Sequence, residues 1–192
     1  MIFSLAQISE LNQLEFKCGE ILCFHISHQS SVDWRQLATL LHERFVVDGK
    51  SVSIARPASN EYSVFTFWRP MTASEWLRRK LSLARSGSEA IIEELRRHDL
   101  KSDDPLTVVA GTPKALLGIC VATASKPDVL IYSTQALDFE GSHAVHQKIS
   151  QRAGDYCGIH ISTPSIHGDG SPAARICPKP CQCIELPDLN LP

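Results

Sequence analysis

Strand-length apolar runs alternate with helix-like segments along most of the chain. Four runs have the length and composition of buried strands: 21–26, 51–55, 128–132 and 157–161. Three segments between them place apolar residues at helical spacing: 33–45, 113–125 and 143–152. Strands and helices in alternation are typical of a mainly parallel sheet with helices on its faces, because parallel strands need crossover connections. The sequence therefore predicts an α/β fold.

The middle of the chain has a different, helical pattern. Thr72 and Glu75 have the spacing of a capping box, which opens a helix, and we expect 86–88 (Ser-Gly-Ser) to break it. A second helix is predicted over about 89–100. These two helices predict a helical lobe over about 60–105, between two strand-containing halves.

Composition and charge exclude some of the classes of protein to which this chain could belong. The chain has 192 residues, 43% of them hydrophobic, and a net charge of −2, which argues against nucleic-acid binding by charge. No apolar run approaches the roughly 18–20 residues of a membrane span. The N-terminal stretch lacks the basic region and cleavage site of a secretory signal. We therefore expect a cytoplasmic protein with no direct membrane span.

The cysteines do not predict a disulfide scaffold, because there are seven of them. Three lie in a Gly/Pro-rich tail, 166–192, that we expect to be extended: Cys177, Cys181 and Cys183. With His160 and His167 they suggest zinc, but their spacing matches no common zinc finger. We expect a thiol-bearing tail without a metal.

The order of these landmarks resembles the ATP-binding subunits of ABC transporters. Residues 19–24 resemble the strand that leads into their phosphate loop, and 125–132 resemble their second nucleotide-site strand. Residues 136–138 resemble the loop that closes the ATPase dimer, and 158–163 the strand before the switch histidine. The resemblance covers about 14–165. It implies a P-loop NTPase fold of the ABC ATPase type, in a domain over 1–165 with the helical lobe inserted.

The phosphate loop implied by this resemblance lacks the residues that its chemistry requires. Such a loop needs glycines for close backbone approach, a Lys for the phosphate charge and a Ser or Thr for Mg²⁺. No glycine is present, Val32 stands at the Lys position, and Asp33 replaces the metal-binding hydroxyl. The degenerate loop comprises Ser27, His28, Gln29, Ser30, Ser31, Val32 and Asp33.

The other catalytic positions implied by the resemblance are also changed. Ser133 and Thr134 stand where the family has a metal-binding Asp and a catalytic Glu, and Pro164 stands at the switch histidine. Neither hydroxyl is a general base at neutral pH. We therefore expect no catalytic residue, no metal and no cofactor. Binding of Mg-ATP is the alternative that stays open.

Two further sets of residues are candidates for contacts with a partner. Gly111 matches a remnant of the family signature, and Thr112 offers a hydroxyl at the start of the next helix, although it is also suited to cap that helix. The resemblance places Asp138 near the seam between paired domains. On the lobe, we expect an exposed docking surface, with ordinary lobe core as the alternative: Trp68, Met71 and Trp76, next to Phe67.

Together these features predict a non-hydrolysing ABC-type subunit, in which the fold was retained without the ATPase chemistry. The resemblance implies that it pairs with a paralogous ATPase subunit and docks onto a membrane permease, which would make it peripheral at the inner membrane. Two alternatives remain. One is a weak ATP-binding subunit that contributes Thr112 and Asp138 to a partner's ATP site, and the other is a free-standing regulatory module.

Overall fold

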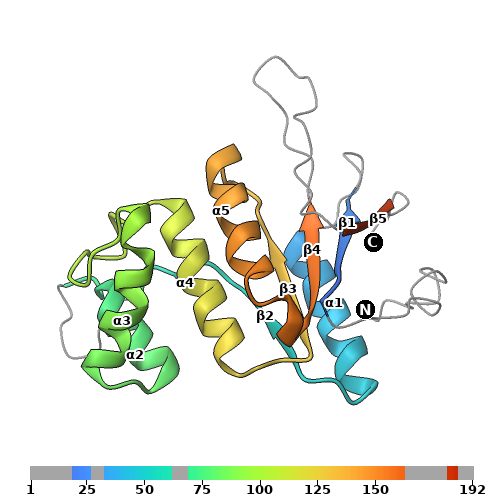
Figure 1. Cartoon of the computed structure of the whole chain (residues 1–192), viewed down its shortest axis with the longest axis horizontal. Coiled ribbons are helices and arrows are strands. Elements are labelled where there is room, and N and C mark those ends of the chain that lie inside the picture. The colour runs from blue at the N-terminus through green and yellow to red at the C-terminus, as the bar shows by residue number, and fades with distance from the viewer. Residues whose placement is uncertain (1–18, 27–32, 62–68, 163–180, 186–192) are drawn as a thin grey trace.

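A five-stranded sheet forms the centre of the molecule (Figure 1). The computed structural model describes residues 19–26, 33–61, 69–162 and 181–185, the last for its backbone. The strand order is β2-β3-β4-β1-β5, and all these pairings are parallel. The strands are β1 (Ile21–His25), β2 (Val52–Ile54), β3 (Val129–Ser133), β4 (Cys157–Ser162) and β5 (Cys181–Glu185). The four strands expected from the apolar runs are present, as predicted.

One face of the sheet is covered by α1 (Trp34–Val47). Leu22 and Phe24 of β1 are buried with Leu37 and Leu41 of this helix, in one apolar cluster. The two helical residues lie four apart, which places them on the same face, one turn from each other. The chain leaves the helix through a turn at Gly49, whose φ of +75° is accessible to glycine at no steric cost.

The opposite face is covered by α4 (Gly111–Ala124) and α5 (Phe139–Ser150). Both begin before the predicted starts at 113 and 143, and α5 does so because Asp138 caps it. The buried residues under these helices belong to the larger apolar cluster, with Leu130, Leu116 and Ile149 among them. Since both faces are covered, the central strands are buried and read as continuous apolar runs.

The lobe consists of α2 (Ala73–Leu81) and α3 (Arg85–Leu95), followed by a 3₁₀ turn (Arg96–His98). The predicted capping box is confirmed: Thr72 accepts from the Glu75 N–H, and Glu75 accepts from the Thr72 N–H. The predicted break at 86–88 is wrong, because the chain turns at Ser82, with φ of +51°, and 86–88 lie in the first turn of α3. Ser88 is buried there, and its hydroxyl bonds the Arg85 carbonyl and the Ser74 hydroxyl.

The docking surface expected on the lobe includes two residues that the structure describes, and neither of them is exposed. Met71 and Trp76 are both buried in the main core, so their predicted exposure is wrong. The capping box sets the phase of α2 and turns Trp76 inward, where its Nε1 donates to Glu61 at 3.3 Å. Phe67 and Trp68 lie outside the described residues.

The C-terminal tail returns to the sheet. Strand β5 pairs with β1 from Ile21 with Cys181 to His25 with Glu185. This pairing gives β1 a neighbour on each side, and the sequence analysis did not foresee it. Residues 163–180, which include Pro164 and His167, lie outside the described part of the chain.

A charged contact joins α5 to α3. Lys148 has a side chain only 6% exposed and is bonded to Glu94, which is 53% exposed. This hydrogen bond lowers the pKa of Glu94, although partial burial opposes the shift. The lobe is thus held to the helix layer by an ion pair with a desolvated ammonium, as well as by apolar packing.

We predict that Glu94→Gln destabilises the fold, because it leaves the buried Lys148 ammonium without its carboxylate. The expected loss is about 1–3 kcal/mol, below that of a fully buried pair because Glu94 is half exposed. Urea unfolding measures it. Glu93→Gln is the matched control, since Glu93 pairs with Arg96 in solvent and should change stability by under about 0.5 kcal/mol. Equal effects of the two variants would contradict this role of Lys148.

Candidate functional site

The carboxyl ends of the strands define the first candidate region. The helix after β1 covers one face of the sheet and the helix after β3 covers the other, and α/β folds of this kind typically bind ligands at the carboxyl edge where the helices change face. Asp33 lies there before α1, and Ser133 and Thr134 lie there at the end of β3. Most of the degenerate loop, residues 27–32, lies outside the described part of the chain.

Asp33 is the N-cap of α1. Its Oδ1 accepts a hydrogen bond from the Arg35 N–H at 3.4 Å, and its own N–H donates to Gln36 Oε1 at 3.0 Å. The carboxylate therefore lies at the positive end of the helix, where a phosphate loop would place a phosphate.

The hydroxyls at the end of β3 are engaged within the chain. Ser133 Oγ accepts from the Gln135 N–H at 3.2 Å, and Thr134 Oγ1 is hydrogen-bonded to His160 Nε2 at 3.1 Å. The next carboxylate along the chain is Asp138, which caps α5.

A buried polar cluster lies between the sheet and α5. The His160 ring stacks on Tyr132, with centroids 5.0 Å apart, and meets His146 edge to face at 4.6 Å. Its Nδ1 lies 3.8 Å from Cys23 Sγ, and the Tyr132 hydroxyl is 3.2 Å from His146 Nδ1. Desolvation, with His146 and His25 nearby, lowers the pKa of His160 well below its usual value. His160 is therefore neutral at physiological pH and links β4 to the segment after β3.

The sequence analysis missed this cluster. From the sequence, His160 is a candidate partner of the tail cysteines and lies near the position of the switch histidine, and neither interpretation predicts a buried cluster. One signal for the cluster is present in the sequence: polar residues spaced two apart within an apolar strand lie on the same face of that strand. Cys23 and His25 have this spacing in β1. Among the described residues, no group of three or more His, Cys, Asp or Glu could hold a metal ion.

Thr112 and Asp138 lie together, where α4 and α5 begin. Asp138 Oδ1 accepts from the Gly141 N–H at 2.7 Å. A Cβ placed on Gly141 would lie 2.2 Å from Thr112 Oγ1 and 2.9 Å from Asp138 Oδ1, so only glycine fits there. The sequence analysis did not single out Gly141. Thr112 does not cap α4, because Ala110 is the N-cap and makes no side-chain cap bond.

A hollow of about 740 Å³ lies beside this junction, and we refer to it as the α4–α5 hollow. Its lining includes Thr112, Asp138, Val108 and Phe139. Val108 and Phe139 are 74% and 69% exposed, among the few large hydrophobic side chains in the described chain that are so exposed. Both side chains therefore present apolar surface to solvent beside the hollow.

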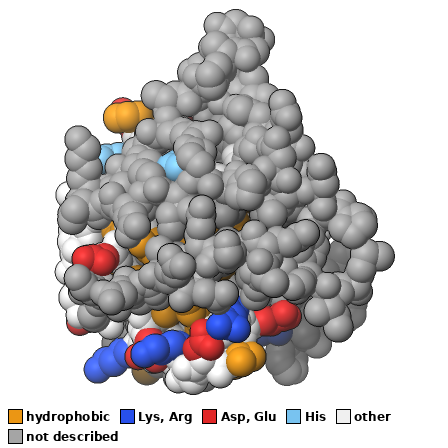
Figure 2. All heavy atoms as spheres, turned by 90° about the vertical axis from the view of Figure 1, so that its right-hand side faces the viewer, with side chains coloured by type: hydrophobic (Ala, Val, Ile, Leu, Met, Phe, Trp, Pro, Cys, Tyr) orange, Lys and Arg blue, Asp and Glu red, His pale blue; other side chains and the backbone are white. Residues whose placement is uncertain are grey.

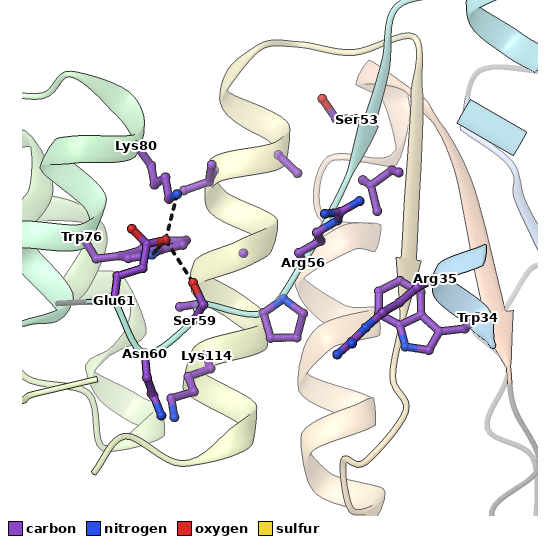
Figure 3. Close-up of a pocket in the computed structure, with 16 residues that line it drawn as sticks. Trp34, Arg35, Ser53, Arg56, Ser59, Asn60, Glu61, Trp76, Lys80 and Lys114 are labelled. Atoms are coloured by element: carbon purple, nitrogen blue, oxygen red, sulfur yellow. Dashed lines mark hydrogen bonds and ion pairs between the residues drawn. The ribbon is translucent and has the colours of Figure 1, made fainter. Parts of the chain in front are cut away.

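A second, larger pocket of about 980 Å³ lies between the sheet and the lobe (Figure 3). Its wall is formed by the segment that follows β2, by α1, by α2 and by α4. Because its residues come from four separate stretches of sequence, the sequence analysis did not foresee it.

Charged side chains of both signs lie intermixed along the lower edge of the face shown in Figure 2. The described part of this face therefore has no continuous basic surface of the kind that binds a nucleic-acid backbone. In the same described residues, no helix combines the length and the apolar character that crossing a membrane would require.

No family model and no curated protein matches the sequence, but solved structures match the fold. The ATP-binding cassette MJ0796, in a dimeric post-hydrolysis state bound to ADP and Pi, gives a TM-score of 0.50 at 14% identity, over 77% of both chains. An inward-facing metal-chelate type ABC transporter gives 0.53 at 15% identity, over 78% of this chain and 64% of the other. The chain thus has the fold of ABC-transporter ATP-binding cassettes, as its landmarks indicated. At these identities the similarity establishes the fold alone.

We predict that His160 makes stability depend on pH. Its folded pKa is depressed, so the unfolded chain takes up a proton below about pH 6.5 that the folded chain does not. The stabilisation is complete above that pH and is lost as the pH falls toward the folded pKa. For one proton, the free energy of unfolding changes by at most about 1.4 kcal/mol per pH unit.

Urea unfolding between pH 7.5 and pH 5 tests this prediction. His160→Gln should be less stable at neutral pH but should lose stability more slowly on acidification than the native chain. His143→Gln is the control, since His143 is exposed on the same helix layer. An unchanged slope in His160→Gln would contradict the prediction.

Proposed function

We propose that this chain is a non-hydrolysing, ABC-type ATPase-like subunit that works by pairing with a second subunit of the same fold. The observation that carries the proposal is the carboxylate of Asp33, which caps α1, the helix that follows the residues resembling a phosphate loop. Two like unit charges about 4 Å apart repel by roughly 4 kcal/mol at an effective dielectric constant of about 20. The helix dipole contributes only about 0.3–1 kcal/mol in the opposite direction. Repulsion therefore outweighs the attraction of the helix terminus for a phosphate.

The groups near the end of β3 support the absence of hydrolysis. Activation of water needs a base within hydrogen-bond reach of it. Thr134 is bonded to His160, and Ser133 accepts from the backbone. His160 is neutral but fully buried, so it does not contact solvent.

The α4–α5 hollow supports the pairing part of the proposal. Exposed Val108 and Phe139 flank Thr112 and Asp138 there, and the solved cassette MJ0796 with the same fold is dimeric. Burying two such side chains in an interface removes apolar surface from water, which favours association. We assign this hollow to the partner subunit, a paralogous ATPase.

The second fold neighbour comes from the structure of a metal-chelate type ABC transporter in an inward-facing conformation, which supports a permease as a further partner. That contact would place the chain at the cytoplasmic side of the inner membrane. Met71 and Trp76 do not provide it, because both are buried in the lobe.

A second candidate function is a weak ATP-binding subunit that completes a partner's site with Thr112 and Asp138. Their proximity at the rim of the hollow favours it. However, Asp138 is occupied as the cap of α5, and the Thr112 hydroxyl faces Gly141. Both groups would have to give up these contacts to reach a nucleotide.

We predict that 5 mM Mg-ATP leaves the thermal unfolding midpoint of the chain unchanged. A ligand at a hundredfold excess over its Kd adds about 2.7 kcal/mol, which raises the midpoint of a domain of this size by roughly 5–10 °C. Differential scanning calorimetry measures the shift. A rise of several degrees would contradict the proposal and would require the nucleotide site to be mapped.

We predict that native affinity purification of the full chain recovers an ABC ATPase subunit together with a permease. Val108→Ser and Phe139→Ser should each lower the recovery of the ATPase at least fivefold, because they remove apolar contacts at the α4–α5 hollow. Val47→Ser is the matched control, since Val47 is 79% exposed on α1 and does not line the hollow. Recovery of neither protein would refute pairing and favour a free-standing regulatory module.

A further inference from the structure

The segment from Ala55 to Glu61, here named the connector, is held rigidly against the helix layer. The Ala55 N–H donates to the Ile131 carbonyl at 2.8 Å, and the Ala58 N–H donates to the Lys114 carbonyl at 2.9 Å. Between them, Gly118 of α4 meets the backbone of Arg56, since a Cβ there would lie 2.0 Å from the Arg56 carbonyl oxygen. The connector therefore has a defined path across α4, and it holds Arg56 in place.

The far end of the connector is locked onto the lobe by Glu61. Its carboxylate accepts from Lys80 Nζ at 2.9 Å and from Ser59 Oγ at 3.0 Å, and Arg79 lies 3.3 Å away (Figure 3). Partial burial raises the pKa of Glu61, but the hydrogen bonds from Lys80 and Ser59 outweigh it and lower the pKa overall. Glu61 is thus ionised, and its charge is already compensated by its own neighbours.

The pocket beside the connector has an excess of positive charge. Its described lining contains four basic side chains and a single carboxylate, Glu61. The basic side chains come from α1, the connector, α2 and α4: Arg35, Arg56, Lys80 and Lys114. Within the described part of the chain, neither Arg56 nor Lys114 forms an ion pair. This concentration of cations contrasts with a net charge of −2 for the chain.

Size and shape favour a small ligand. A volume of about 980 Å³ is at the upper end of the roughly 300–1,000 Å³ of small-molecule pockets. Figure 3 shows Arg56 on the connector, Arg35 on α1 and Lys114 on α4, so cations from three separate elements line the pocket. A ligand that satisfies them needs more than one anionic group.

The aromatic residues argue against recognition of a nucleobase. Trp34 and Trp76 line the pocket, but both rings are almost fully buried. The Arg35 guanidinium lies 5.9 Å from the Trp34 ring centroid and Lys80 Nζ lies 5.8 Å from that of Trp76. The rings thus support the cations and leave no open face on which a base could stack.

We propose that the connector pocket binds a small polyanion, a ligand with at least two phosphate or carboxylate groups, through Arg56 and Lys114 with Arg35 beside them. The anchors are side-chain cations: Arg35 lies in the first turn of α1, two residues after Asp33, and the described lining of this pocket shares no residue with that of the α4–α5 hollow. The site is therefore independent of the pairing proposed for the α4–α5 hollow.

Isothermal titration calorimetry of the full chain, with pyrophosphate and with citrate as probes, tests the proposal. We expect one or both probes to bind with a Kd below 1 mM at about 50 mM salt. Arg56→Gln and Lys114→Gln should each raise that Kd at least tenfold, because each removes a charged donor. Arg78→Gln, an exposed arginine on α2 outside the pocket, removes the same charge and should change the Kd less than twofold.

The outcomes separate the alternatives. Binding of pyrophosphate alone or citrate alone supports the site and selects phosphate or carboxylate chemistry. Absence of binding by both probes at 5 mM, or equal weakening in all three variants, would overturn the proposal. A hexaglutamate peptide that binds tenfold more tightly than either probe would also overturn it, in favour of an acidic partner segment. Since Arg56 and Lys114 lie on different elements, a folding defect in one variant leaves the other to decide.

Discussion

The arrangement of the molecule depends on the close approach of the connector to α4 at Gly118. The Arg56 carbonyl lies where a side chain would otherwise be, so the chain crosses the helix at backbone contact distance. This crossing leads the chain from β2 at the edge of the sheet to the lobe, and it lets Ala58 bond the Lys114 carbonyl. The position of the lobe and the walls of the connector pocket both follow from it.

The charges in this chain are not distributed as one would expect for a protein with the fold of an ATP-binding cassette. The N-termini of α1 and α5, which begin at the carboxyl edge of the sheet, are capped by the carboxylates of Asp33 and Asp138. Each cap satisfies orphan N–H groups and occupies the positive end of a helix dipole. The cations Arg56 and Lys114 lie instead on the connector and on α4, and neither forms an ion pair with another described residue. In the proposed pocket, anions are bound by side-chain cations and not by the backbone N–H groups of a helix terminus.

Local signals were sufficient for much of the fold. Thr72 and Glu75 act within one turn, so their spacing predicted the start of α2 correctly. The next boundary was misplaced, because Ser-Gly-Ser at 86–88 favours a break by composition, while the hydroxyl contacts of Ser88 retain it in the helix. The predicted exposure of Trp76 failed for a related reason: its partner Glu61 lies fifteen residues away, beyond the reach of helical periodicity.

The sequence by itself determined the α/β class and the parallel sheet, because these depend on residue type and on short-range spacing. Only the tertiary structure decided that β5 returns beside β1, that Thr112 meets Asp138 across Gly141, and that Arg35 and Lys114 border one pocket. Such contacts join residues far apart in the chain. They are selected by the packing of helices on a sheet, which periodicity along the sequence does not encode.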